Sequence, residues 1–335
     1  MKIGINHQII RGTKPEEVAR YDAWWEAVSP WVDLIRCDTH MGAYAWRVDP
    51  KHVYSNGDDA MKPWRELGVR ANIAGVEIDL IRDGFPTSPE WKAIGGDWST
   101  FDEPNTWREW CVPSVAWSKV NAWVNAVAKA LIAAGASTRW QGPNECFDRG
   151  HDRHSFKRML NIYAQSSYSR KWTGPALWGD GKLGFGRENL LRQLGEWETM
   201  RKYGEKLDKA EFVAINVYPD YKAGVTVDVA SNLKRQVENL VIVDEWASKR
   251  GLKVVIPEFG FAKIQTTNEA ERVALTAFVF DCAALLPSID TLTLYWDSGD
   301  YFISNEGLKE IGRKIGTSPD AAEYVKAIQD SLTQV

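Results

Sequence analysis

The stretch STRWQGPNE at positions 137–145 decides the fold prediction for this chain. Its first four residues are typical of a short strand, and the pair Asn144-Glu145 follows where that strand ends. A second stretch, KVVIPEFG at 253–260, is an apolar strand that carries Glu258 to its carboxyl end. Parallel barrels keep their functional side chains at the carboxyl ends of their strands. We therefore expect the two glutamates to lie at the same end of one barrel.

Outward from these stretches, strands and helices alternate along the chain. Strands are predicted at 2–6, 31–36, 69–73, 137–140, 176–178, 211–218, 253–260 and 291–296, and helices at 13–29, 58–67, 113–134, 154–170, 188–203, 227–249, 268–286, 306–314 and 319–332. Eight strands alternating with helices predict an α/β fold, a single closed (β/α)8 TIM barrel over 1–335. The alternative, an open doubly wound sheet, needs a glycine-rich phosphate turn after the first strand. Residues 4–8, GINHQ, are not such a turn.

Local signals set the predicted ends of the helices. Thr13 is predicted to cap the first helix, because a proline and two acidic residues follow within its first turn. Gly68, Gly135 and Gly251 are predicted to stop three later helices.

A long loop after the third predicted strand, 80–111, is rich in tryptophan. It contains Trp91, Trp98, Trp107 and Trp110. Loops of this length in compact domains are functional or disordered, and the aromatic residues argue against disorder. We interpret the loop as one wall of a substrate cleft, and the alternative is a subdomain that only packs on the barrel.

Composition excludes several classes of protein. The chain has 335 residues, 44% hydrophobic and 26% charged, which is typical of a globular, soluble protein. A net charge of −4 does not suggest a nucleic-acid or anionic-membrane partner, since either would require a basic face. The four scattered cysteines favour free thiols in a reducing compartment over disulfides. No signal peptide or membrane span is visible, so we expect a cytoplasmic protein, export by a non-standard route, or a signal that has been trimmed.

The two glutamates suit glycoside hydrolysis, in which a pair of carboxyl groups flanks the bond that is cleaved. Glu145 is assigned as the general acid/base, and its pKa must be raised by the second carboxylate and by partial burial. Glu258 is assigned as the nucleophile and must stay ionised. Arg36 at the end of the second strand and the hydroxyl of Tyr218 at the sixth are the candidate hydrogen-bond donors to it.

Other residues at the strand ends are candidates for binding the sugar. Asn144 could bond the sugar 2-hydroxyl, and Trp296 could form the floor under the sugar at the cleavage point. His7, Asn6 and His40 are placed equally well in a cleft or in the packed structure.

These residues resemble the pattern of clan A of the glycoside hydrolases, the retaining (β/α)8 enzymes that include the cellulase, mannanase and xylosidase families. The matching residues, in the clan's order, are Arg36, Asn144, Glu145, Asn216, Val217, Tyr218, Glu258 and Trp296. The resemblance covers nearly the whole chain and is nearest to the cellulase-type family or its β-xylosidase-like relatives. It implies double displacement with net retention, a covalent glycosyl-enzyme on Glu258 and no cofactor.

The chain departs from the clan's common residues at three places. Cys146 follows the Asn-Glu pair where many members have proline, and Asn216 stands where histidine is common. The third predicted strand, with 72–75 at its end, lacks the histidine often seen in the cellulase-type family. Substrate identity is therefore not fixed by the resemblance.

Polar residues beyond the two strand ends allow other interpretations. The loop residues Asp148, His151, Asp152 and His154 could bind a metal, line a polar cleft rim or lie on a plain surface loop. Asp297 and Asp300 could bond sugar hydroxyls, but solvated surface residues are the favoured interpretation.

The predicted function is a retaining hydrolase of a β-linked polysaccharide or oligosaccharide, with endo action on a β-1,4-glucan or mannan. We expect a carbohydrate substrate, no nucleic-acid or membrane partner, and a monomer. The alternatives are an exo-acting β-glycosidase and a catalytically silent carbohydrate-binding barrel. A metal-dependent barrel hydrolase is disfavoured, because only five histidines are present and the first strand has no His-x-His.

Overall fold

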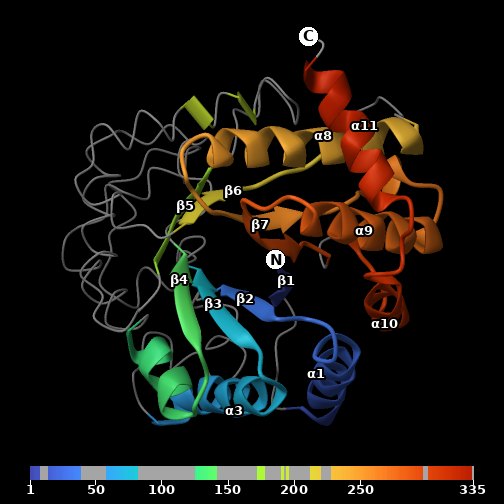
Figure 1. Ribbon diagram of the computed structural model, residues 1–335. Helices are drawn as coiled ribbons and strands as arrows, with labels where there is room; N and C mark the ends of the chain where they lie inside the picture. The colour runs from blue at the N-terminus through green and yellow to red at the C-terminus, as the bar shows by residue number, and fades with distance from the viewer. Residues whose placement is uncertain are drawn as a thin grey trace, which may run out of the picture.

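The structure, a computed structural model, describes residues 1–7, 14–38, 58–81, 125–141, 172–177, 190–191, 194–195, 212–219, 228–296 and 301–333. These residues form a closed barrel of eight parallel strands in sequence order (Figure 1). The strands are β1 (Lys2–His7), β2 (Leu34–Asp38), β3 (Glu77–Ile81), β4 (Thr138–Gln141), β5 (Trp172–Leu177), β6 (Phe212–Ile215), β7 (Val254–Phe259) and β8 (Ile289–Leu294). The helices are α1 (Pro15–Val28), α3 (Asp58–Ala74), α8 (Val229–Ser248), α9 (Glu269–Ala284), α10 (Asn305–Lys314) and α11 (Ala321–Thr333).

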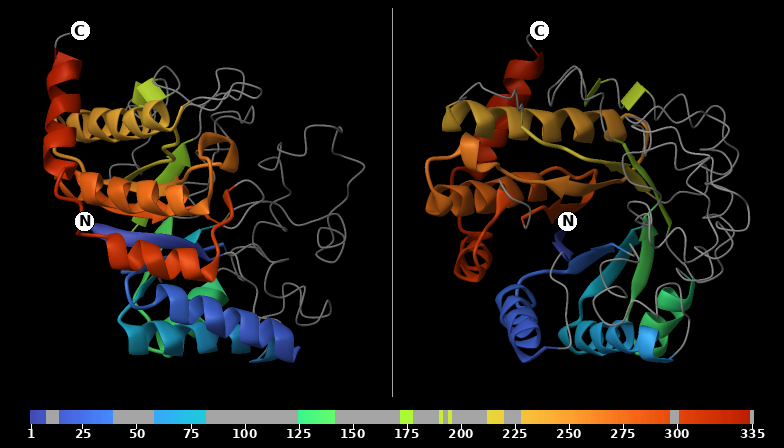
Figure 2. Two further views of the ribbon diagram at one scale, coloured as in Figure 1. Left: turned by 90° about the vertical axis from the view of Figure 1, so that its right-hand side faces the viewer. Right: turned by 180° about the vertical axis from the view of Figure 1, so that it is seen from behind.

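Pairing of the first strand with the last closes the barrel. Lys2 lies opposite Thr291 and Ile5 opposite Leu294 in the β1–β8 pair. Each other strand pairs with the next strand along the chain, and the helices lie outside the sheet (Figure 2). The predicted (β/α)8 barrel is confirmed, whereas the tryptophan-rich loop falls outside the described residues from position 82 onward.

The outer faces of the strands form one apolar core with the helices. On β8, Leu292 and Leu294 belong to this core, and α1 and α3 contribute the fully buried Trp24 and Trp64. The side chains at alternate strand positions face the barrel interior, and many of them are polar. Buried examples are Arg36, Asp79, Arg139, Thr291 and Thr293.

The predicted third strand at 69–73 is wrong, because those residues belong to helix α3. Gly68 does not stop the helix. It allows close contact with the helical segment at 125–133, since a Cβ on Gly68 would lie 2.7 Å from the Cβ of Ala134 and 3.0 Å from the carbonyl oxygen of Leu131. The helix ends at Gly75, whose φ of +70° favours glycine. The third strand is β3, so the histidine comparison at 72–75 was made in the wrong segment.

Several predicted boundaries also differ from the structure. The cap of α1 is Lys14 rather than Thr13. β2 begins three residues later than predicted, so Arg36 lies in its middle. β5 covers Trp172–Leu177 instead of 176–178. The predicted helix at 154–170 lies outside the described residues, as does most of the one at 188–203.

Other predicted ends are confirmed. Gly135 and Gly251, with φ of +89° and +64°, follow helical segments as expected. Helix α9 begins at its cap Asn268, whose side chain accepts a hydrogen bond from the backbone of Glu271. In the part of the chain that the structure describes, no helix is both long and apolar enough to cross a membrane.

Candidate active site

Glu258 lies near the carboxyl end of β7, and a β-bulge turns its side chain into the barrel. Ile256 faces the helices, so strict alternation would place residue 258 on that same outer face. Instead, Ile256 and Phe259 pair with Leu292 and Leu294 of β8, three positions against two. The extra residue in β7 shifts by one position the alternation of its side chains between the two faces of the sheet. Phe259 then returns to the outer core, and Glu258 faces inward.

Pro257 occupies the bulge, where a residue without a backbone N–H interrupts the ladder at little cost. Its carbonyl oxygen accepts a hydrogen bond from Nδ2 of Asn6 at 3.2 Å. The same Nδ2 lies 3.4 Å from the carbonyl oxygen of Leu294. Asn6 therefore ties β1 to β7 and β8 beside the bulge.

Both carboxylate oxygens of Glu258 accept a hydrogen bond inside the barrel. Nη1 of Arg36 lies 2.8 Å from Oε1, and the hydroxyl of Tyr218 lies 2.9 Å from Oε2. Glu258 is 7% exposed and Arg36 only 3%, so the ion pair is shielded from water. Charge-assisted hydrogen bonds of this kind are stronger than neutral ones and hold the carboxylate in one orientation. The structure thus brings together the three residues that the sequence pattern joined, while their chemical roles stay predictions.

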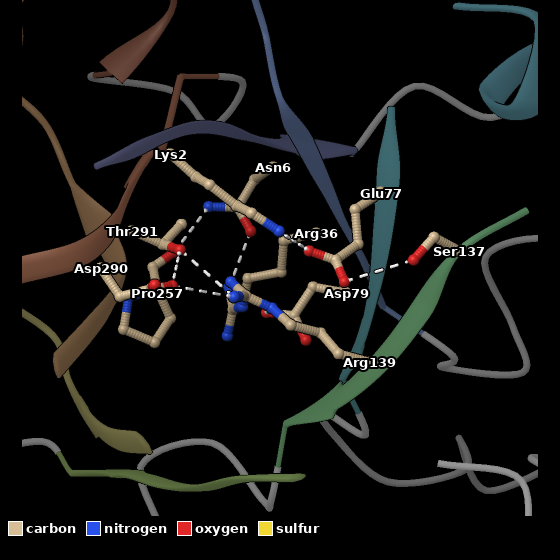
Figure 3. Close-up of polar contacts among 10 residues, drawn as sticks. All are labelled: Lys2, Asn6, Arg36, Glu77, Asp79, Ser137, Arg139, Pro257, Asp290 and Thr291. Carbon is tan, nitrogen blue, oxygen red and sulfur yellow. Dashed lines mark hydrogen bonds and ion pairs between the residues drawn. The ribbon is translucent and has the colours of Figure 1, made fainter. Parts of the chain in front are cut away.

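Arg36 is held in place by a second acceptor. Its Nη1 also donates to Oδ1 of Asn6 at 2.7 Å, directly opposite in the β1–β2 register (Figure 3). The side chain of Asn6 therefore binds Arg36 through its oxygen and the β7 backbone through its nitrogen. From the sequence, Asn6 was placed equally well in a cleft or in the packed structure, and this linking role was not predicted.

Tyr218 follows β6, and α8 fixes its backbone. Its carbonyl oxygen accepts from Nδ2 of Asn239 at 3.1 Å, and the carbonyl of the preceding Val217 accepts from Nε2 of Gln236, also at 3.1 Å. The ring of Tyr218 packs edge-on against Tyr301, with centroids 5.7 Å apart. These contacts point the hydroxyl at Glu258.

The remaining described candidates, Asn216 and Trp296, are both buried. Trp296 is only 1% exposed, and its ring lies nearly parallel to that of Trp24 in α1, with centroids 6.3 Å apart. Its Nε1 donates to the carbonyl oxygen of Asn6 at 2.8 Å. In this structure the indole serves packing, and its role as a sugar floor stays a prediction.

Next to Arg36 in the strand register lies a group of charged residues that was not predicted from the sequence. Nε of Arg139 lies 3.5 Å from Oδ2 of Asp79, and its Nη1 lies 3.4 Å from Oδ2 of Asp290 (Figure 3). Burial raises the pKa of the Asp79 carboxyl, and the guanidinium groups of Arg139 and Arg36 oppose that rise. The available signal was the alternation in EIDLI and TRWQ, where charged residues recur on the inner face.

Two residues before Asp79 on β3, Glu77 forms an ion pair with Lys2 of β1. Its other carboxylate oxygen lies 3.5 Å from the hydroxyl of Ser137. Polar side chains therefore occupy more than one level of the barrel interior.

Several predicted site residues lie outside the described residues. They are Asn144, Glu145, Asp148, His151, Asp152, His154, His40, Asp297 and Asp300. The side chain of His7 is likewise not described. Among the described side chains, no group of three or more His, Cys, Asp or Glu residues is placed to hold a metal ion.

Comparison with known proteins shows similarity in structure but not in sequence. No protein-family model matches the chain, and no curated protein is similar to it in sequence. A solved structure of GH5_18 from Bifidobacterium longum subsp. longum, in complex with Manβ1-4GlcNAc, aligns with a TM-score of 0.60 at 12% identity, over 98% of this chain and 79% of that one. An endo-β-1,4-mannanase from Thermotoga petrophila also gives 0.60 at 12%, over 95% and 77%.

A third structure is similar over nearly the full length of both chains. The family 5 xyloglucanase from Paenibacillus pabuli aligns with a TM-score of 0.54 at 13% identity, over 97% of this chain and 98% of that one. The chain therefore has the (β/α)8-barrel fold of the family 5, clan A glycoside hydrolases.

Proposed function

We propose that this protein is a retaining glycoside hydrolase in which Glu258 is the nucleophile and Glu145 the general acid/base. The observation that carries the proposal is the environment of Glu258. Its two oxygens accept separate hydrogen bonds, from Arg36 at 2.8 Å and Tyr218 at 2.9 Å, in the interior of the barrel. Two separate donors fix the direction of this carboxylate, as a nucleophile requires.

In the first step, a Glu258 oxygen attacks the anomeric carbon and the bond to the leaving-group oxygen breaks. Glu145 gives its proton to that oxygen, so the aglycone leaves as an alcohol. In the second step, Glu145 takes a proton from water, the water oxygen attacks the anomeric carbon, and Glu258 leaves as a carboxylate. Two inversions give net retention, and the chemistry calls for no cofactor.

The proposed substrate is a β-linked polysaccharide or oligosaccharide of the β-1,4-glucan or mannan type. Similar folds are found in an endo-β-1,4-mannanase and in GH5_18 solved with Manβ1-4GlcNAc, which supports a β-linked substrate. The tryptophan-rich segment at 82–111 would supply stacking surfaces along an extended cleft. We propose endo action by a monomer, and product sizes from glucan, mannan and xylan would separate it from an exo-acting β-glycosidase.

The test combines product stereochemistry with one variant. Proton NMR of early products should show the β anomer from the wild type. Glu258→Ala should lose turnover, and azide should restore cleavage with an α-glycosyl azide as product. Full activity of Glu258→Ala would reject the nucleophile assignment. Binding of oligosaccharides without cleavage by the wild type would instead indicate a silent carbohydrate-binding barrel.

A further inference from the structure

A row of polar side chains in register crosses four neighbouring strands, and three of its members, Arg36, Asp79 and Arg139, carry alternating charges. The register pairs Asn6 with Arg36, Arg36 with Asp79, and Asp79 with Arg139. Paired residues on adjacent strands are about 4.8 Å apart along the row, and all four side chains lie in the barrel interior (Figure 3). Asp79 therefore occupies the position between two arginines.

Asp79 is fully buried, and the charged groups that face it come from three strands. They are Arg36 from β2, Arg139 from β4 and Glu77 from its own strand β3. Nε of Arg139 is 3.5 Å from Oδ2 of Asp79. A guanidinium group keeps its proton under all ordinary conditions. The row therefore holds two fixed positive charges, and one of them, Arg36, forms an ion pair with Glu258.

We propose that Asp79 is a positioning residue that balances the charge of Arg36 while Glu258 is esterified. This inference rests on the proposed function, because it concerns the covalent glycosyl-enzyme. When the Glu258 oxygen bonds to the anomeric carbon, the carboxylate becomes a neutral ester. Arg36 then loses the charge of its partner in a buried environment, where an unbalanced charge is costly. The neighbouring carboxylate of Asp79 lowers that cost.

Removal of the Asp79 charge should act on the two chemical steps in opposite directions. Arg36 would hold the Glu258 carboxylate more strongly, so the step that consumes this charge should slow by roughly tenfold. The second step regenerates the carboxylate, so it should be as fast as in the wild type or faster. General loosening of the barrel would slow both steps together.

The experiment uses 2,4-dinitrophenyl 2-deoxy-2-fluoro-β-cellobioside and the matching mannobioside on the full-length protein. Release of dinitrophenol reports formation of the fluoroglycosyl-enzyme, and recovery of activity after removal of the reagent reports its hydrolysis. We expect Asp79→Asn to form the adduct roughly tenfold more slowly and to recover at least as fast. Glu77→Gln removes a buried carboxylate two residues earlier on the same strand, and it should leave the ratio of the two rates unchanged.

Three outcomes overturn the inference. Equal ratios in Asp79→Asn and wild type would show that Asp79 carries no charge that acts on Glu258. Parallel slowing of both steps would show a structural role only. No adduct in the wild type would reject the double displacement itself, and this inference with it. If Asp79→Asn does not fold, Asp79→Asn combined with Arg139→Gln removes both charges of the pair, and the ratio should shift in the same direction.

Discussion

The hydroxyl of Tyr218 is the contact whose removal can be predicted most closely. Tyr218→Phe deletes one oxygen, while the edge-on packing on Tyr301 and the hydrogen bond from Asn239 to the residue 218 carbonyl are kept. The lost hydroxyl lies 2.9 Å from Oε2 of Glu258. A hydrogen bond to a charged group contributes about 1.5–3 kcal/mol.

Two measurements follow from that magnitude. The free energy of unfolding in urea should fall by about 1.5–3 kcal/mol, because the buried carboxylate loses a donor. If Glu258 is the nucleophile, kcat/KM should fall about 10- to 100-fold, since each 1.4 kcal/mol is a factor of ten. Tyr324→Phe removes a phenol hydroxyl from α11, far from the barrel interior, and is the matched control for both assays.

The outcomes that would refute this reasoning are distinct. An unchanged unfolding free energy in Tyr218→Phe would mean that the hydroxyl does not stabilise the Glu258 carboxylate. A normal loss of stability with unchanged kcat/KM would mean that the hydrogen bond exists but plays no part in catalysis.

Three further predictions concern the framework. Gly68→Ala should lower the free energy of unfolding in urea by about 1–2 kcal/mol despite the better helix propensity of alanine, because its Cβ would lie 2.7 Å from the Cβ of Ala134. A gain in stability would show that α3 and the helical segment at 125–133 can separate freely. Ser304→Ala should cost about 1–2 kcal/mol by the same measurement, since its hydroxyl caps α10 at Gly307 N and also donates to Glu269; an unchanged midpoint would refute this cap. Asp228 caps α8, and the hydrogen bonds that it accepts from Ser231 lower the pKa of its carboxyl. The stability that this cap gives the protein is therefore present above the ordinary aspartate pKa, and it is lost as the pH falls through the lower pKa of the folded state. The stability difference between wild type and Asp228→Ala, followed from pH 7 to about pH 3, should therefore shrink on acidification, and a constant difference would contradict the assignment.

The alternation of strands and helices was enough to predict the barrel, because each strand of a parallel barrel packs on the helices with its outer face. The positions of the glycines, however, predicted the ends of the helices only in part. Gly135 and Gly251 end helices with positive φ, but Gly68 lies inside one and permits close helix packing. The two uses of glycine produce the same local sequence, and only the tertiary contact separates them. The displaced third strand follows from that one error.

Only part of the candidate site was predicted from the sequence. Arg36, Tyr218 and Glu258 were found because each lies on or directly after a predicted strand. The bulge at Pro257 was not predicted, although a proline within an apolar strand is a signal for one. The charged row of Asp79 and Arg139 was also missed, because inward-facing charges in strands were not analysed as partners across the barrel.

The measurement that tests the central claim most directly is the identification of the residue that carries a trapped sugar. The wild type is treated with the 2-deoxy-2-fluoro-β-cellobioside or mannobioside, and its intact mass and peptide map are recorded by mass spectrometry. We expect one fluoroglycosyl group per chain, bound to Glu258, with no label on Glu258→Ala. Label on another carboxylate, or turnover of ordinary β-glycosides with inversion and without any adduct, would contradict the assignment of Glu258 as the nucleophile.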